Sequence, residues 1–203
     1  SKVLQLRSVE FAKKYDVVVH VRSSLNDNPG TLVTKEDADM ETVLVSGIAY
    51  NKDEAKIAVM RVPDKPGVAA QLFSPLSTAN IMVDMIIQNV SHEGFTDLTF
   101  TVPRGDFKRA KKIVEETAAK IGAAGVQTNE SIAKVSIIGV GMRSHSGIAS
   151  KMFATLSAEG VNIQMISTSE IKVSCVIDDK YTELAVRVLH EAFDLDKDQV
   201  AEG

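Results

Sequence analysis

The sequence of 203 residues has no tryptophan, one cysteine, only 5% aromatic residues and no long hydrophobic run. A single cysteine excludes a disulfide framework and favours a cytoplasmic location. Cys175 lies in an apolar strand pattern (IKVSCVI), which predicts a buried, unreactive thiol. No apolar run approaches the roughly 20 residues of a membrane-spanning helix, so we expect no membrane partner. The net charge of −4 and the few aromatic residues argue against a nucleic-acid partner.

Sequence motifs for catalysis are also missing. The four histidines show no metal-ligand spacing to cysteine or carboxylate residues, so we expect no metal site. Residues 139–144 (GVGMRS) resemble a phosphate-binding loop only superficially, because the GK[ST] ending is absent. We therefore expect neither catalytic residues nor a cofactor in this chain.

The N-terminal part of the chain has its own pattern. Residues 2–15 show helical apolar spacing, and residues 17–21 (VVVHV) predict a short buried strand. Residues 23–40 are rich in turn-forming and then charged residues, which predicts turns, a linker and a domain boundary. We assign residues 1–34 to one domain and residues 35–41 to the linker. Because the chain opens without methionine inside structured-looking sequence, we expect it to be a piece of a longer protein.

A loop followed by an amphipathic helix occurs twice in the remaining sequence. Residues 64–80 (DKPGVAAQLFSPLSTAN) are matched by residues 144–160 (SHSGIASKMFATLSAEG). Between residues 66 and 88 the offset is a constant 80 positions, and the apolar helix faces agree. The identical residues are Gly67, Ala69, Phe73, Leu76, Ser77, Met85 and Ile86, which recur as Gly147, Ala149, Phe153, Leu156, Ser157, Met165 and Ile166. This correspondence predicts two structurally equivalent repeats.

Each repeat has the pattern of a ferredoxin-like βαββαβ unit, so the predicted fold class is α+β. For the first repeat we predict strands at 56–62, 81–89, 95–102 and 124–130 and helices at 67–79 and 106–121. For the second repeat we predict strands at 134–140, 161–168 and 171–177 and helices at 147–159 and 180–193.

The second repeat lacks a fourth strand after its last helix, and the unassigned strand 42–49 could supply it. The first repeat, 55–130, would then be inserted into a discontinuous second repeat, 42–54 plus 131–195, followed by a tail at 196–203. RNA-recognition domains share this fold, but Glu93 and Asp97 stand where a basic and an aromatic residue are expected, so we disfavour that function.

The repeated loop–helix junction is itself a candidate binding site. The first backbone N–H groups of a helix lack intrahelical partners and carry partial positive charge, so they can hold a carboxylate. Gly67 and Gly147 would let such a ligand approach the backbone, although they could equally serve only to form a tight turn. Asp84, in an apolar run, could bind a ligand ammonium or form a salt bridge with a lysine or arginine. Gln164 is the neutral counterpart of Asp84, so the two repeats should not bind one ligand equally well.

The motifs PDKPGVAAQLF…VDMIIQNVS and GMRSHSGIASKMF…VNIQMISTSEI closely resemble the tandem ACT domains of bacterial aspartokinase, and residues 1–34 resemble the end of its amino-acid-kinase domain. In that family the second ACT domain is interrupted by the first. The resemblance implies a parent enzyme that phosphorylates aspartate with ATP and Mg²⁺ and is inhibited by lysine, threonine or both. The nucleotide-binding and catalytic motifs are absent here, so we expect a regulatory part without kinase activity. Homodimerisation through ACT units and contact with a kinase domain or subunit are the further partners implied.

The resemblance also assigns effector-binding roles to individual positions. These are Asp64, Gly67, Val68, Ala69, Asp84, Gln88 and Ser91 in the first repeat, and Met142, Ser144, His145, Gly147, Ile148, Ala149, Asn162, Ile163, Ser169 and Glu170 in the second. The sequence departs from many relatives at Ser146 and Gln164, and the second departure makes Asp84 the expected ammonium partner if lysine binds. An alternative is that the ACT pair only mediates dimerisation and binds no effector.

Overall fold

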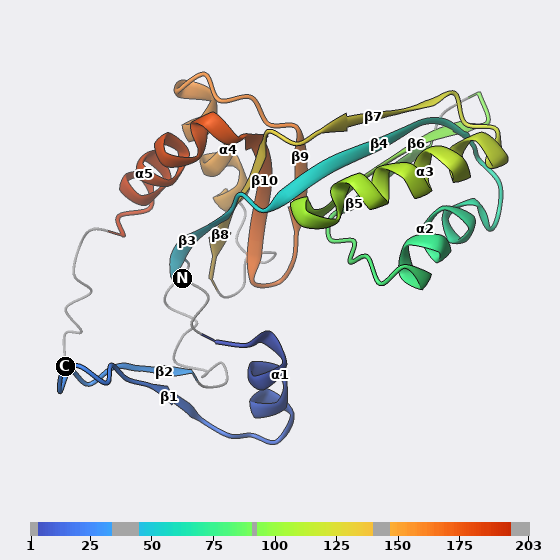
Figure 1. Cartoon of the computed structure of the whole chain (residues 1–203). Helices are drawn as coiled ribbons and strands as arrows, with labels where there is room; N and C mark the ends of the chain where they lie inside the picture. The colour runs from blue at the N-terminus through green and yellow to red at the C-terminus, as the bar shows by residue number, and fades with distance from the viewer. Residues whose placement is uncertain (1–3, 34–44, 91–92, 140–146, 196–203) are drawn as a thin grey trace. The chain divides into compact units, whose positions relative to one another are not determined.

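The chain divides into two units, Ser1–Val43 and Leu44–Gly203, which are described separately (Figure 1). The computed structural model describes residues 4–33, 45–90, 93–139 and 147–195. The predicted linker and tail therefore lie outside the described residues. None of the helices in these ranges is long and apolar enough to cross a membrane.

The N-terminal unit contains helix α1 (Leu6–Lys14) and strands β1 (Val19–Val21) and β2 (Thr31–Val33). The two strands form an antiparallel ribbon. Strand β1 lies within the predicted strand 17–21, but Val17 and Val18 are more than half exposed, so the predicted burial is wrong. A ribbon of two strands cannot cover both faces of either strand. The β2 strand also lies in the stretch predicted as turns and linker, where its short TLV run was masked by surrounding polar residues.

The first repeat is an antiparallel sheet covered on one face by two helices (Figure 1). The strand order is β5-β6-β4-β7. The elements are β4 (Glu54–Pro63), α2 (Val68–Thr78), β5 (Ile86–Val90), β6 (Phe95–Pro103), α3 (Phe107–Ile121) and β7 (Gly125–Asn129). A short 3-10 turn, Arg104–Asp106, leads into α3.

The second repeat has the same architecture, with strand order β3-β8-β10-β9. Its elements are β3 (Gly47–Asn51), β8 (Ile132–Ile138), α4 (Ile148–Ala158), β9 (Met165–Thr168), β10 (Lys172–Asp178) and α5 (Thr182–Ala192). The 3-10 turn Asp179–Tyr181 precedes α5. Since β3 precedes the whole first repeat in sequence but pairs with β8, the first repeat is inserted into the second, as predicted. The exact domain boundaries stay a prediction.

The strands that follow α2 and α4 begin later than predicted. Strand β5 starts at Ile86 and β9 at Met165, because the preceding residues form only isolated hydrogen bonds with the neighbouring strand. One example is the Asp84 N–H, which donates to the Thr101 carbonyl at 3.0 Å. The predicted strand 42–49 is described only from residue 45, and β3 begins at Gly47.

Each repeat has its own hydrophobic core between its sheet and helices. The fully buried side chains of the first core include Ile57, Leu72, Leu76, Phe100 and Val114. Those of the second core include Val135, Met152, Leu156, Ile177 and Leu189. A third, smaller cluster joins the repeats and contains Met85, Ile132, Met165 and Val176. Met85 and Met165 are equivalent positions, so the repeats contact each other through equivalent surfaces.

Two local predictions about side chains and turns are confirmed. The residues after α2 and α4, Asn80 and Gly160, have positive φ angles of 54° and 66° and end the helices in the left-handed conformation. Cys175 is fully buried, and burial raises the pKa of its thiol to about 12. This thiol is therefore protonated and unreactive at neutral pH.

Because the third cluster connects the two cores, we expect the two repeats to unfold together. The substitution Leu156→Ala should lower the free energy of unfolding by about 2–5 kcal/mol. Thermal unfolding followed by calorimetry should still show one transition for both repeats. The control Ile166→Ala, at a side chain that is 42% exposed, should change stability by less than about 0.5 kcal/mol. Two separate transitions would contradict this expectation.

Candidate functional site

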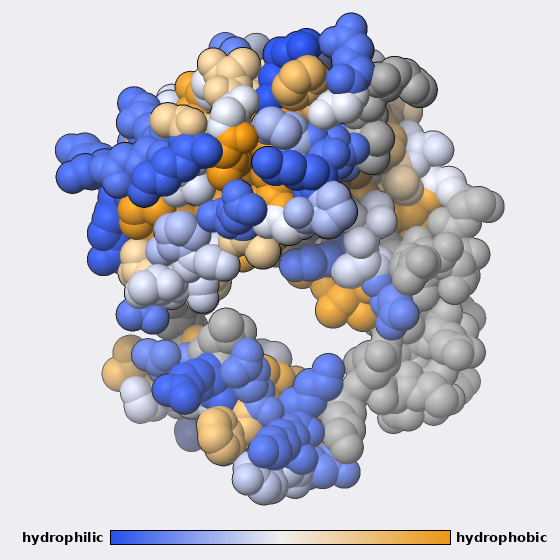
Figure 2. Space-filling model, turned by 90° about the vertical axis from the view of Figure 1, so that its right-hand side faces the viewer, coloured by the Kyte–Doolittle hydropathy of each residue, from blue (hydrophilic) through white to orange (hydrophobic). Residues whose placement is uncertain are grey.

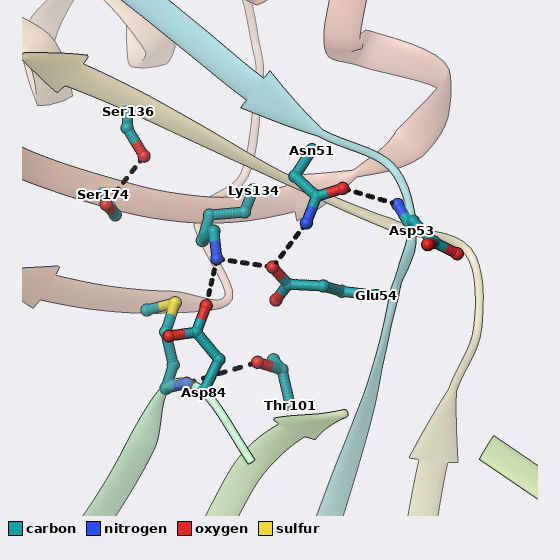
Figure 3. Close-up of polar contacts among 9 residues, drawn as sticks. Asn51, Asp53, Glu54, Asp84, Thr101, Lys134, Ser136 and Ser174 are labelled. Carbon is teal, nitrogen blue, oxygen red and sulfur yellow. Dashed lines mark hydrogen bonds and ion pairs between the residues drawn. The ribbon is translucent and has the colours of Figure 1, made fainter. Parts of the chain in front are cut away.

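The polar contacts between the repeats centre on Lys134, near the start of β8 (Figure 3). Its Nζ lies 2.5 Å from Oε1 of Glu54 and also contacts Oδ2 of Asp84. The side chains of Lys134 and Glu54 are 13% and 6% exposed, whereas that of Asp84 is 49% exposed. Asn51 Nδ2 donates to the same Glu54 oxygen at 2.9 Å. This arrangement is a largely buried ion pair with a second, more exposed carboxylate at its edge.

The electrostatics of Lys134 follow from these partners. Burial disfavours the charged ammonium, but the hydrogen bonds and charges of Asp84 and Glu54 outweigh it and raise the pKa of Lys134. The sequence left two partners open for Asp84, a ligand ammonium or a lysine or arginine of the protein. The structure shows the second, a salt bridge with Lys134. The structure gives no support to an Asp84 carboxylate that is unpaired and available for a ligand.

The equivalent contact on the other repeat uses different chemistry. Lys56 in β4 pairs with Asn129 in the same way as Lys134 pairs with Asn51, so the two lysines are equivalent. Nζ of Lys56 donates to Oε1 of Gln164 at 2.5 Å, and Gln164 is the counterpart of Asp84. Because an amide oxygen carries no full charge, burial dominates and lowers the pKa of Lys56.

The chain crosses between the sheets twice, in two equivalent turns. Asn51 Oδ1 accepts the N–H of Asp53 at 3.0 Å, and Asn129 Oδ1 accepts the N–H of Ser131 at 2.9 Å. A side-chain oxygen that accepts the backbone N–H two residues later in the chain stabilises the turn conformation. We call the contact region between the repeats the seam; it comprises these turns, the two lysine contacts and the Met85 cluster.

Arg104 connects the two crossing turns. Its backbone N–H donates to the Asp53 carbonyl at 3.2 Å, and its Nη2 donates to the Glu130 carbonyl at 2.6 Å. The same guanidinium nitrogen lies 3.8 Å from Oδ2 of Asp179, at the start of the last helical segment. Arg104 therefore contacts one turn through its backbone, and the other turn and the second repeat through its side chain.

The loop–helix junctions lie at the opposite end of each repeat from the seam. Gly67 and Gly147 precede α2 and α4 with φ angles of 89° and 112°. This conformation favours glycine by itself, and a Cβ at either position would meet no atom within 4 Å. Among the described residues, no side chain caps the start of either helix. The Val68 N–H at the start of α2 donates to the Lys65 carbonyl at 3.3 Å, so a ligand at this helix start would use the N–H groups of the residues that follow.

Figure 2 shows the side of the molecule on which the turn between β4 and α2 lies. This surface is mostly hydrophilic, with hydrophobic residues in separate patches. An apolar groove of about 490 Å³ runs beside α2 and is lined by Phe73, Ile81, Met82, Val83 and Ile86, with Ser77 and Asn80. Met82 and Val83 are the counterparts of Asn162 and Ile163, which the resemblance places in an effector pocket.

The structure brings only some of the proposed effector residues together. Asp64, Gly67, Val68 and Ala69 are grouped at the turn of the first repeat. Asp84 is bonded to Thr101 beside the start of β4. Strand β4 has ten residues, so at about 3.3 Å per residue Asp84 lies roughly 30 Å from that turn.

In the second repeat, too, the proposed effector residues lie in separate groups. Gly147, Ile148 and Ala149 begin α4, and Ser169 and Glu170 lie in the turn between β9 and β10. Asn162 and Ile163 lie next to Gln164 at the seam. Gln88 is in the middle of edge strand β5, while Ser91, Met142, Ser144 and His145 lie outside the described residues. A pocket combining residues of both groups would need a second chain.

Sequence reasoning missed the seam residues Lys56, Lys134, Glu54 and Arg104. The only available signal was the alignment of the repeats, which matches Lys56 with Lys134 and so indicates an equivalent role. The described residues contain no cluster of histidine, cysteine and carboxylate side chains suited to a metal ion.

Breaking the buried ion pair should destabilise the protein strongly. Lys134→Met keeps most of the aliphatic side chain but leaves Glu54 buried without its cation. We expect urea denaturation to show a loss of about 3–5 kcal/mol, partly recovered when Glu54→Gln is added. The control Lys180→Met removes an ion pair with Asp178 whose lysine is 63% exposed, and it should cost less than about 1 kcal/mol. Similar losses for both variants would refute the assigned importance of Lys134.

The raised pKa of Lys134 predicts an alkaline limit to this stabilisation. A raised pKa means that the folded protein holds the proton more tightly than the unfolded chain does. The contribution is therefore complete below the ordinary lysine pKa of 10.5 and is lost as pH rises above it towards the folded value. Denaturation curves of the wild type and Lys134→Met should converge above this pH. A gap that stays constant through strongly alkaline pH would show that the charge of Lys134 is not the source of the stabilisation.

Comparison with known proteins agrees with this architecture. Models of the ACT domain match residues 56–122 and 135–193. Aspartate kinase from Pseudomonas putida is 58% identical over 197 residues, which cover 97% of this chain and 48% of that protein. The chain thus spans about half the length of the curated relatives it matches.

Solved structures show the same relationship. A crystal structure of aspartokinase alpha and beta subunits is 58% identical, with 74% of this chain and 99% of that chain covered and a TM-score of 0.70. The ligand-free regulatory subunit of aspartate kinase from Thermus thermophilus is 40% identical, with 73% and 98% covered and a TM-score of 0.70. Escherichia coli aspartokinase III in complex with lysine and aspartate shares the fold at 24% identity, with 94% and 42% covered and a TM-score of 0.73. The chain therefore belongs to the aspartokinase family, and its two ACT domains are those of the family's regulatory region.

Proposed function

We propose that this chain senses threonine or lysine and thereby inhibits an aspartokinase that phosphorylates L-aspartate with ATP. The observation that supports the proposal is the pair of helix starts behind Gly67 and Gly147, which no side chain in the described part of this family member caps. Each could bind the α-carboxylate of an amino acid through backbone N–H groups. The ATP and Mg²⁺ of the reaction would belong to the catalytic domain.

The effector pocket would lie between two copies of the chain. The turn Asp64–Ala69 and the segment Asn162–Ile163 are at opposite ends of their repeats, so one chain cannot form a pocket from both. A homodimer that places the turn of one chain against the segment of the other would complete it. The second turn, with Gly147 and Ile148, would meet Met82 and Val83 of the other chain in the equivalent way.

The seam bears on the choice of effector. Asp84 is bonded to Lys134, so the ammonium of a bound lysine would have to compete with a tethered lysine side chain. A neutral amino acid such as threonine faces no such competition. We therefore favour threonine wherever Asp84 borders the pocket, and the earlier expectation that Asp84 binds lysine loses its main argument.

Titration calorimetry with threonine and lysine tests the proposal. Gly67→Asn and Gly147→Asn form a matched pair, because asparagine tolerates positive φ and its side chain could cap the helix start in place of the ligand. We expect binding to the wild type and at least about tenfold weaker binding for the variant whose turn holds the effector, since a hydrogen bond to a charged group is worth that much.

The competing function is dimerisation without a ligand. It is suggested by the exposed Ile86 and Ile166 on the open edge strands β5 and β9. It predicts a dimer that releases no heat with either amino acid and keeps its melting temperature in their presence. That result would remove the sensing function while leaving the fold assignment intact.

A further inference from the structure

The two repeats present equivalent short segments at the seam, residues 81–84 and 161–164. Both segments link a helix to an edge strand and are held at their ends by equivalent backbone bonds. Ile81 and Val161 N–H groups donate to the carbonyls of the preceding helices at 2.9 Å. The Asp84 N–H donates to Thr101, and the Gln164 N–H donates to the Val176 carbonyl at 2.8 Å.

The side-chain contact that holds each segment from the opposite repeat differs in strength. Asp84 contacts Lys134, which also holds the buried Glu54. Gln164 receives a bond from Lys56 at 2.5 Å and a weaker one from Asn129 at 3.5 Å. The Lys134–Asp84 contact is an ion pair between two full charges, although Asp84 is half exposed. It is stronger than an ammonium–amide contact, because the amide oxygen of Gln164 offers only a partial charge.

The more weakly held segment, 161–164, contains the two positions to which the resemblance itself assigns an effector role. Asn162 and Ile163 lie directly between the two backbone anchors of segment 161–164. Asn162 is exposed, and Ile163 packs partly against the core of the second repeat. Lys56 belongs to the first repeat and bonds to Gln164, the neighbour of these two residues. It can therefore influence where Asn162 and Ile163 lie without contacting a ligand itself.

We propose that Lys56 is a positioning residue that reaches across the seam to fix the effector-contacting segment 161–164. The bond to Gln164 sets where Asn162 and Ile163 stand relative to the first repeat. Its loss leaves the segment attached through its backbone ends, the packing of Ile163 and the long Asn129–Gln164 bond. The role in effector affinity depends on the proposed sensing function, whereas the role in ordering the segment does not.

Amide hydrogen exchange in the 203-residue chain separates ordering of the segment from global stability. In Lys56→Met we expect exchange of the Gln164 amide to accelerate by about tenfold or more, since the opening of this segment becomes easier. The Asp84 amide, in the matched segment of the first repeat, should change by less than about twofold. Lys56→Arg keeps the cation and its donors and should exchange like the wild type. Gln164→Glu creates an ion pair with Lys56 and should slow exchange at residue 164.

Two results of this experiment would overturn the ordering role. One is an unchanged rate at Gln164 in Lys56→Met, and the other is an equal acceleration at Gln164 and Asp84, which would indicate general destabilisation. Calorimetry on the same variants tests the second half of the proposal. Lys56→Met should bind threonine or lysine about tenfold more weakly, and Lys56→Arg should restore the affinity.

The failure of this inference can be told apart from the failure of the sensing function. If the wild type binds neither amino acid, the sensing function is wrong, and exchange at Gln164 alone decides whether Lys56 orders the segment. If the wild type binds an effector and Lys56→Met binds it equally well despite faster exchange, the positioning role is wrong.

Discussion

The buried contact of Lys134 with Glu54 is the interaction on which the arrangement of the two repeats depends. It lies where the chain passes from one sheet to the other, so a single ion pair constrains both crossing turns and the cluster around Met85. Arg104 adds hydrogen bonds to both turns. With these contacts in place, the two repeats form one body, because moving either would leave charged groups buried without partners.

The duplication also explains why the proposed effector residues fall into two separate groups on a single chain. Each repeat has a helix start with a left-handed glycine at one end and a seam segment at the other, separated by the length of a strand. The repeats are equivalent in backbone but differ in chemistry at Asp84 and Gln164. A duplicated scaffold can in this way keep its architecture while its two halves acquire different affinities for ligands.

The periodicity of the sequence was sufficient to predict the two repeats, their helices and the insertion of one repeat into the other. Positive φ at Asn80 and Gly160 followed from residue type and position. The seam could not be predicted, because a lysine at the start of a strand gives no indication of a carboxylate 50 or 80 residues away. Asp84 is the clearest case: its apolar surroundings required a cationic partner, but only the structure identifies that partner as Lys134.

The account rests on the two ACT domains being held in one fixed orientation by the seam. Residual dipolar couplings of backbone amides in the two repeats measure their relative orientation directly. Couplings from β4, β6 and α3 should fit the same alignment tensor as those from β8, β10 and α5. Two tensors of clearly different magnitude or direction would show that the domains move independently, and would contradict the central role given to Lys134.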